Sequence, residues 1–240
     1  MNFLSQLSVV DMATLTMSAV GLIGGIMSTL ITMNAKYYED QRQLRMGVGD
    51  FAQKILALRA EDELLNVKAL RREERNEEFA LAHANNLRSQ KTLARLMMDL
   101  LEELKRPASP TEYELLGSAL TANGDPAGDK YWRLAIARTT DVPGKRAIIN
   151  QFAYALVRHG READGERAFA EALASTGGDP VQEGFVHETR GRALHAIRKL
   201  PDAKAAFDKA DAAYMRIPDE GARQVWRESL ASARATVGLA

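Results

Sequence analysis

The stretch that decides the fold reads NQFAYALVRHGREADGERAFAEALA and runs from Asn150 to Ala174. A second run, RGRALHAIRKLPDAKAAFDKA from Arg190 to Ala210, repeats its order of small, apolar and charged residues. A less regular copy, ELLGSALTANGDPAGDKYWRLAIA, occupies residues 114–137. One aromatic residue marks each copy, at intervals of 37 and 38 residues: Trp132, Phe169 and Phe207. Self-similarity at such a period predicts stacked helical units that bury their apolar faces on one another.

The three copies resemble the tetratricopeptide repeat (TPR), a pair of antiparallel helices with small and apolar residues at the contact between them. The middle copy fills those contact positions without a gap: Phe152, Ala153, Leu156, Gly160, Phe169 and Ala172. It departs at Gly165, where the family usually has alanine, and the third copy has Arg198 in place of the turn glycine. The resemblance implies an all-α, TPR-like array over residues 107–240, closed by a capping helix after Pro218.

The resemblance also implies a binding surface, because in this family the first helix of each pair lines a concave groove. The groove residues carried over from the second and third copies are Asn150, Tyr154, Arg158, Glu188, Arg192 and His195. The first copy adds Glu114, Ser118 and Thr121. On this interpretation Tyr154 anchors a peptide of a partner protein, while Arg158 and Arg192 bind its carboxylates. The alternative is that all of these residues belong to ordinary solvated helix faces.

Residues 36–106 precede the repeats and are highly charged, free of proline and rich in helix-forming residues. Gly47-Val48-Gly49 predicts an interruption, after which Asp50 has the pattern of an N-cap. A seven-residue apolar spacing fits a coiled coil at both ends of the segment, but the middle, RREERNEE from Arg71 to Glu78, is polar on every side. The segment therefore predicts either one long helical stalk or a helical hairpin. Pro107 and Pro110 mark its end.

Residues 12–35 contain no charged side chain. A bilayer core of about 30 Å needs about 20 helical residues, so this run predicts a transmembrane helix that contacts lipid. A buried helix and an assembly arm are the alternatives, and a cleaved signal peptide is disfavoured because no Lys or Arg precedes the run. Lys36, Arg42 and Arg45 follow it, which predicts a single-pass topology with the N-terminus outside and the C-terminal region in the cytoplasm.

Small residues recur one turn apart within this run. Gly21 and Gly25 form a G-x-x-x-G pair, and Thr14 with Ser18 repeats the small-residue spacing. Such spacing lets two membrane helices approach closely, so these four residues are the predicted packing face of a homo-oligomer.

Composition excludes several functions. The 240 residues carry 32 Lys and Arg against 32 Asp and Glu, which lacks the basic excess of nucleic-acid-binding domains. The chain has no cysteine, and its four histidines, His83, His159, His187 and His195, show no metal-binding spacing. No phosphate-binding loop or nucleophile elbow occurs. We expect no enzyme activity, no cofactor and no metal.

Three segments result: an anchor at 1–35, a charged helical linker at 36–106 and the repeat domain at 107–240. The leading hypothesis is a membrane-anchored scaffold whose cytoplasmic repeats bind a partner protein. The alternative is a subunit of a homo-oligomeric membrane assembly, such as a pore-forming effector or a secretion component, packed through its small-residue helix.

Overall fold

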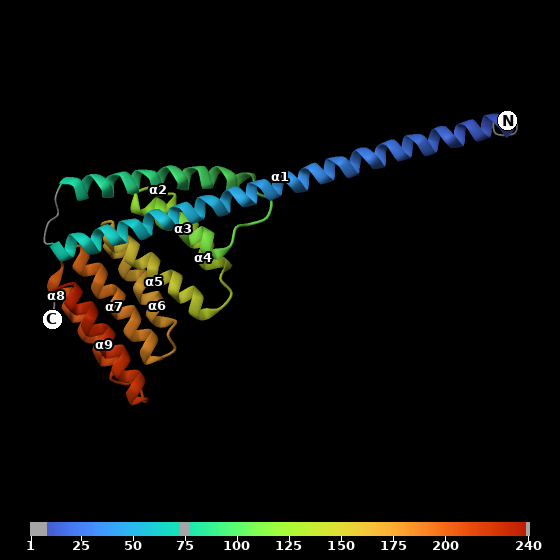
Figure 1. Cartoon of the computed structure of the whole chain (residues 1–240). Helices are drawn as coiled ribbons and strands as arrows, with labels where there is room; N and C mark the ends of the chain where they lie inside the picture. The colour runs from blue at the N-terminus through green and yellow to red at the C-terminus, as the bar shows by residue number, and fades with distance from the viewer. Residues whose placement is uncertain (1–8, 73–76, 239–240) are drawn as a thin grey trace.

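The computed structural model describes the backbone of residues 9–72 and 77–238, and their side chains apart from those of residues 9–26, 63 and 66–72. Within these ranges the protein is all-α, with nine helices and no strand (Figure 1). The helices are α1 Val9–Arg72, α2 Glu77–Glu103, α3 Pro110–Ala122, α4 Gly128–Arg138, α5 Val142–Arg158, α6 Glu162–Ala174, α7 Pro180–Ala196, α8 Leu200–Tyr214 and α9 Glu220–Thr236. The predicted all-α class is therefore confirmed.

Helices α3 to α8 form three antiparallel pairs, α3–α4, α5–α6 and α7–α8, which are the most extensive helix contacts of this region. Each pair coincides with one of the three sequence copies. The apolar residues of the copies fill the space between paired helices, and Trp132, Phe169 and Phe207 are almost fully buried. The Trp132 ring stacks on Phe152 of the following pair at a centroid distance of 5.4 Å. The core therefore continues from one pair into the next.

The first helix of each pair begins with a side-chain cap, and so does α9. The capping residues are Ser109, Asp141, Asp179 and Asp219, each accepting a hydrogen bond from a backbone N–H of the first turn. Helices α4, α6 and α8 have no such cap. These second helices follow a tight turn, whose geometry settles where they begin.

The turn that ends α3, α5 and α7 has the same hydrogen-bond pattern in all three pairs. In α5, the N–H of Arg161 donates to the carbonyl of Leu156 and the N–H of Gly160 to that of Val157, which is the Schellman arrangement. In this arrangement the residue that follows the C-cap must have a positive φ. After α5 this residue is Gly160, with a φ of 79°. In α7 the residue at this place is Arg198, with φ 64°.

The charged segment before the repeats folds as a hairpin, because α1 and α2 pack along each other rather than forming one stalk. Val48 and Ile55 of α1 and Met97 of α2 are fully buried in one cluster with residues of α3, α4 and α5. Arg45 also pairs with Glu112 at 2.7 Å, next to the cap of α3. The hairpin is therefore packed into the same core as the first repeat pair.

The predicted interruption at Gly47-Val48-Gly49 is wrong, because α1 continues through these residues and Asp50 caps nothing. Gly47 lies against α2: a Cβ built on it would be 2.8 Å from Cδ1 of Leu100. Burial of Val48 against α2 outweighs the weak helix propensity of the two glycines.

The middle of the hairpin interface is polar. His83 Nδ1 lies 2.6 Å from Asp62 Oδ1 across the two helices, and Asn86 and Gln90 of α2 are buried. The chain leaves α1 at Arg72 and enters α2 at Glu77, so the hairpin turns inside the polar run RREERNEE.

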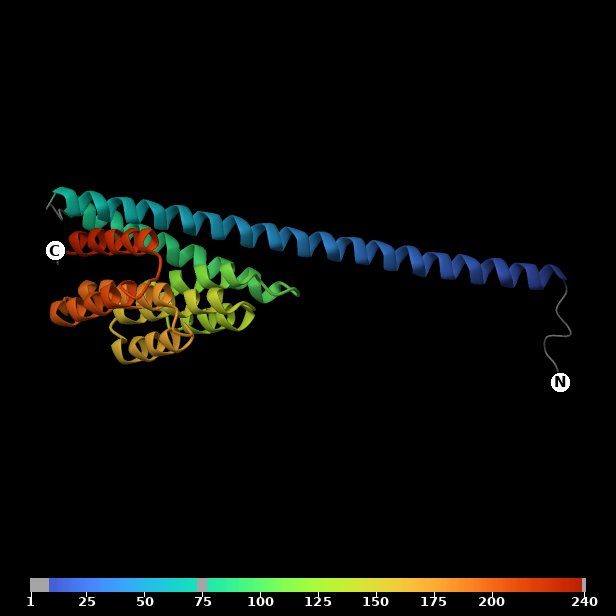
Figure 2. The ribbon, with the colours of Figure 1, turned by 90° about the horizontal axis from the view of Figure 1, so that it is seen from below.

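The N-terminal part of α1 extends away from all other helices, as both ribbon views show (Figures 1 and 2). We call residues 9–35 of α1 the arm, and the described residues from 36 onward the body. The arm is about 40 Å long at 1.5 Å per residue.

Candidate functional site

The six predicted groove residues lie on two neighbouring helices, α5 and α7, and the structure separates them into two groups. Asn150 is 1% exposed, and its Nδ2 donates to Thr189 Oγ1 at 3.0 Å. This hydrogen bond joins α5 to α7 inside the body. Asn150 therefore holds two repeat pairs together and does not face a groove.

Glu188 is also buried, at 5% exposure. Its two oxygens accept hydrogen bonds from Arg192 at 2.6 Å and from the Tyr214 hydroxyl of α8 at 3.2 Å. Burial, reinforced by the carboxylate of Glu188, raises the pKa of Tyr214, so the hydroxyl remains a proton donor. A buried carboxylate is stable only when paired and hydrogen-bonded, and Glu188 is both.

The other four residues remain accessible at the surface: Tyr154, Arg158, Arg192 and His195. Tyr154 is partly buried, and the guanidinium of Arg158 lies 5.6 Å from its ring centroid. The side chain of Arg192 is 51% exposed, and its guanidinium forms an ion pair with the buried carboxylate of Glu188. The accessible groups are therefore one aromatic ring, two guanidiniums and an imidazole, which suit a carboxylate-bearing segment of a partner.

The first repeat contributes less to this surface than expected. Thr121 is buried, donates to the carbonyl of Gly117 and accepts from Trp132 Nε1 at 3.2 Å. Glu114 is partly covered, and this burial raises the pKa of its carboxyl group, although Arg59 of α1 opposes the shift. The nearness of Arg59 shows that α1 runs over this side of α3. Glu114 and Ser118 are both of intermediate exposure, and Thr121 is the buried one of the three.

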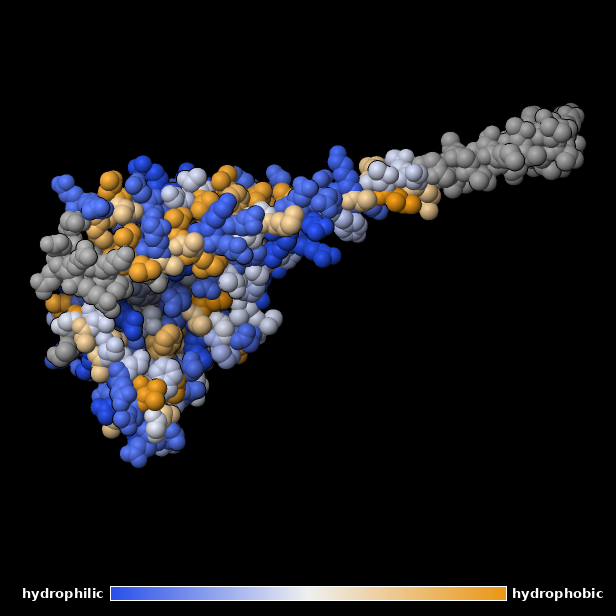
Figure 3. All heavy atoms as spheres, in the orientation of Figure 1, coloured by the Kyte–Doolittle hydropathy of each residue, from blue (hydrophilic) through white to orange (hydrophobic). Residues whose placement is uncertain are grey.

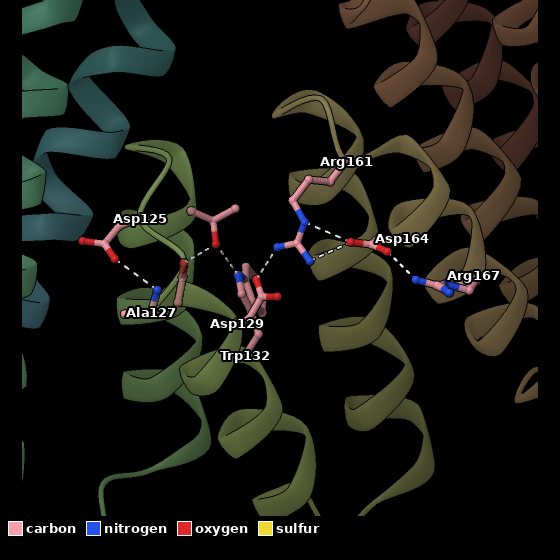
Figure 4. A network of polar contacts seen from close by, with 9 residues as sticks. Asp125, Ala127, Asp129, Trp132, Arg161, Asp164 and Arg167 are labelled. Atoms are coloured by element: carbon pink, nitrogen blue, oxygen red, sulfur yellow. Dashed lines mark hydrogen bonds and ion pairs between the residues drawn. The ribbon is translucent and has the colours of Figure 1, made fainter.

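A chain of ion pairs connects the second repeat pair to the first at the turn between α5 and α6 (Figure 4). Arg161 donates to Asp129 of α4 and to Asp164 of α6, both at 2.7 Å. Asp164 also pairs with Arg167. At the equivalent turn of the third pair, Lys199 bonds Glu162 of α6 at 2.6 Å. A basic residue in the turn thus joins the second and the third pair each to the pair before it, and these contacts were not predicted from the sequence.

The described part of the arm exposes large apolar side chains. Met27, Leu30, Ile31 and Met33, all within seven residues, are 52–65% exposed, whereas equally exposed residues of the body, such as Leu81 and Val225, are scattered along the chain. Figure 3 shows hydrophobic atoms gathered there, next to the grey atoms of the arm. The predicted helix-packing residues Thr14, Ser18, Gly21 and Gly25 have side chains outside the described residues.

Among the residues whose side chains are described, no helix is both long and apolar enough to cross a membrane. Residues 12–26, which make up most of the predicted span, lie outside that set. The transmembrane helix therefore stays a prediction.

Two of the four histidines are hydrogen-bonded or buried. His83 bonds Asp62, and His187 is buried, with its Nδ1 lacking a hydrogen-bond partner. Burial, followed by the charge of Lys209, lowers the pKa of His187. Within the described side chains, no three His, Asp or Glu residues are arranged to hold a metal ion.

Comparison with known proteins gives no relative for this fold and surface: the chain matches no family model, no curated protein sequence and no solved structure. The resemblance to the tetratricopeptide repeat consequently rests on the sequence copies alone.

Proposed function

We propose that this chain is a single-pass membrane scaffold: the arm anchors it, and the cytoplasmic TPR-like body binds a partner protein. The observation that carries the proposal is the arm. Its large apolar side chains are exposed on a helix that no other described part of the chain covers. A bilayer is the surrounding that makes such exposure favourable.

Length and charge support this assignment. The arm is about 40 Å long, and a bilayer core is about 30 Å thick. Its stretch from residue 12 to residue 35 has no charged side chain, and basic residues follow at Lys36, Arg42 and Arg45. By the positive-inside rule the body then lies in the cytoplasm.

The body supports protein binding rather than chemistry. Tyr154, Arg158, Arg192 and His195 form its candidate contact surface, and the buried Glu188 keeps Arg192 oriented before any partner arrives. A pre-oriented guanidinium loses little side-chain entropy on binding, which favours affinity. The anchor adds effective concentration, because it confines a partner near the membrane without making any new contact.

The deciding experiment is an alkaline wash of membranes from cells that express the full chain, a fragment of residues 36–240, or the full-length variant Val20→Lys with Ile26→Lys. The full chain is expected to stay in the membrane pellet. The fragment keeps every contact that the described part of α1 makes with the other helices, so it should fold and be released. Two lysines in the middle of the span oppose insertion and should release the full-length variant as well. Retention of the fragment in the pellet contradicts the anchor.

A second candidate is a homo-oligomeric membrane assembly, such as a pore-forming effector. It is favoured by the same exposed side chains, Met27 to Met33, which copies of the arm could cover for one another. The mass of the complex in mild detergent distinguishes the two functions. If the chain forms such an assembly, the measured mass is a multiple of the chain mass. Gly21→Leu with Gly25→Leu should then reduce that mass and abolish any membrane permeability. A monomer excludes it.

A further inference from the structure

The connection between α2 and α3 reaches back to the base of the arm and is fixed there. The backbone N–H of Lys105 donates to Gln41 Oε1 at 3.0 Å, and Gln41 Nε2 donates to the carbonyl of Glu103 at 3.4 Å. One side chain of α1 thus clamps the connection on both sides of Leu104. The residues that follow, Lys105 and Arg106, are held beside α1 although they are more than sixty positions away in sequence.

This clamp gathers aromatic and basic side chains directly after the uncharged run. We call Lys36, Tyr37, Tyr38, Lys105 and Arg106 the collar. The Tyr37 and Tyr38 ring centroids are 5.7 Å apart with an edge-on arrangement, and Lys105 Nζ lies 5.0 Å from the Tyr37 centroid. Tyr38 is 66% exposed, and Lys36, Lys105 and Arg106 are also exposed. None of the five is part of the body's core.

Acidic residues lie behind the collar, on the side away from the arm. Glu39 accepts a hydrogen bond from Gln43 and lies 3.9 Å from Arg42, and Asp40 is its neighbour. Glu102 and Glu103 end α2. Moving from the arm toward the body, one therefore reaches the basic residues of the collar before these carboxylates.

The collar is also the part of the body nearest to the arm. In both ribbon views the green segment between α2 and α3 is the part of α2–α9 that extends furthest toward the N-terminal end (Figures 1 and 2). A bilayer that holds the arm would meet this segment before any other part of α2–α9.

The chemistry of the collar matches one surrounding, the headgroup layer of a membrane. Tyrosine rings favour that layer because they combine an apolar body with a polar hydroxyl. Lysine and arginine extend their charged ends into it and attract anionic lipids. We propose that the collar lies in the interfacial layer of the cytoplasmic leaflet and binds anionic lipid headgroups. This inference rests on the proposed function, because it needs the arm in the bilayer.

The depth of the collar can be measured in the full-length protein reconstituted into vesicles of phosphatidylcholine and phosphatidylglycerol. The probe is an added tryptophan in Tyr38→Trp, quenched by lipids that are brominated on the upper acyl chain. The matched control is Met215→Trp, an exposed site at the end of α8. Trp132 and Trp226 are present in both proteins and contribute the same background.

The expected result is strong quenching of the emission at residue 38 and little quenching at residue 215. A protein that floats with the vesicles but shows equal, weak quenching at the two sites overturns the collar and leaves the anchor intact. This is also the result expected if a second copy covers the collar. A protein that fails to float with the vesicles overturns the anchor, and the collar with it.

Lipid preference is tested in the same Tyr38→Trp protein, with bromine placed either on the phosphatidylglycerol or on the phosphatidylcholine. Enrichment of anionic lipid around the collar predicts stronger quenching when phosphatidylglycerol carries the bromine at equal bromine content. Lys105→Gln with Arg106→Gln should reduce this difference, because Lys36 is then the one basic residue left in the collar, whereas Lys204→Gln with Lys209→Gln on α8 should preserve it. Equal quenching by the two lipids in the Tyr38→Trp protein that carries none of these glutamine substitutions overturns headgroup binding.

Discussion

Arg198 lies in the turn after α7 with a φ of 64°, a backbone conformation that residues with a Cβ adopt at a cost of about 1–2 kcal/mol. The equivalent turn after α5 uses Gly160, which adopts the same region without that cost. Arg198→Gly should therefore raise the free energy of unfolding by about 1 kcal/mol. Urea unfolding followed by circular dichroism measures the change, and Gly160→Arg is the matched control, expected to lower stability by a similar amount. An unchanged midpoint for both variants would show that these turns are not strained.

His187 links stability to pH. Burial lowers the pKa of its imidazole in the folded protein, so below about pH 6.5 the unfolded chain binds more protons at this residue. The stability that neutral His187 contributes is present above its unfolded pKa and is lost as the pH falls through the folded value. The fragment 36–240 should lose more unfolding free energy between about pH 7.5 and about pH 5.5 than the same fragment with His187→Leu. Parallel losses in the two proteins would assign the acid sensitivity to other groups.

At the scale of helix pairs, Gly165 decides how closely α5 and α6 approach. A Cβ built on Gly165 would be 2.4 Å from Cγ2 of Val157 and 2.9 Å from the carbonyl oxygen of Ala153. Gly165→Ala should lower the unfolding free energy by about 1–3 kcal/mol, because the backbone oxygen cannot move without separating the helices. Gly49→Ala is the control, since its added methyl would meet no atom within 4 Å and should stabilise α1 by up to about 1 kcal/mol. Thermal unfolding of both variants measures the difference, and a loss in both would point to a general helix effect.

The positions of the helix pairs could be predicted from the sequence. The spacing of Trp132, Phe169 and Phe207 located all three pairs, because burial on one face leaves a periodic pattern in the chain. The Gly47-Val48-Gly49 prediction failed, because local propensity was outweighed by the packing of α2, which no local pattern reveals.

The candidate site was less predictable than the fold. The resemblance to the tetratricopeptide repeat placed Asn150 and Glu188 on the same groove surface as Tyr154 and Arg192, and it treated all four alike. Asn150 is buried because Thr189, 39 positions away, completes its hydrogen bond, and Glu188 because Tyr214 does so from the next helix. Such partners depend on the stacking of pairs and cannot be inferred from either helix alone. The clamp of Gln41 on Lys105 was missed for the same reason.

At the scale of the whole molecule, partner capture is expected to depend on the accessible residues of α5 and α7. Tyr154→Ala with Arg192→Ala removes the aromatic ring and one guanidinium, so proteins that co-purify with the full chain from detergent-solubilised cells should be lost. Val142→Ala with Arg133→Ala changes exposed residues elsewhere and should retain them. Quantitative mass spectrometry of the two purifications measures the result, with circular dichroism to show that both variants fold. Equal recovery would exclude this surface.

The continuity of α1 has a mechanical consequence for the proposed membrane scaffold. A flexible linker lets a binding domain explore a volume whose size grows with linker length. Here one unbroken helix joins the arm to the hairpin that packs into the core. A membrane helix tilts by about 20° on average, and any tilt of the arm would turn the body by the same angle. The bilayer would then set the distance of the α5 and α7 surface from the membrane and its orientation. A bound partner would be held at that distance and in that orientation.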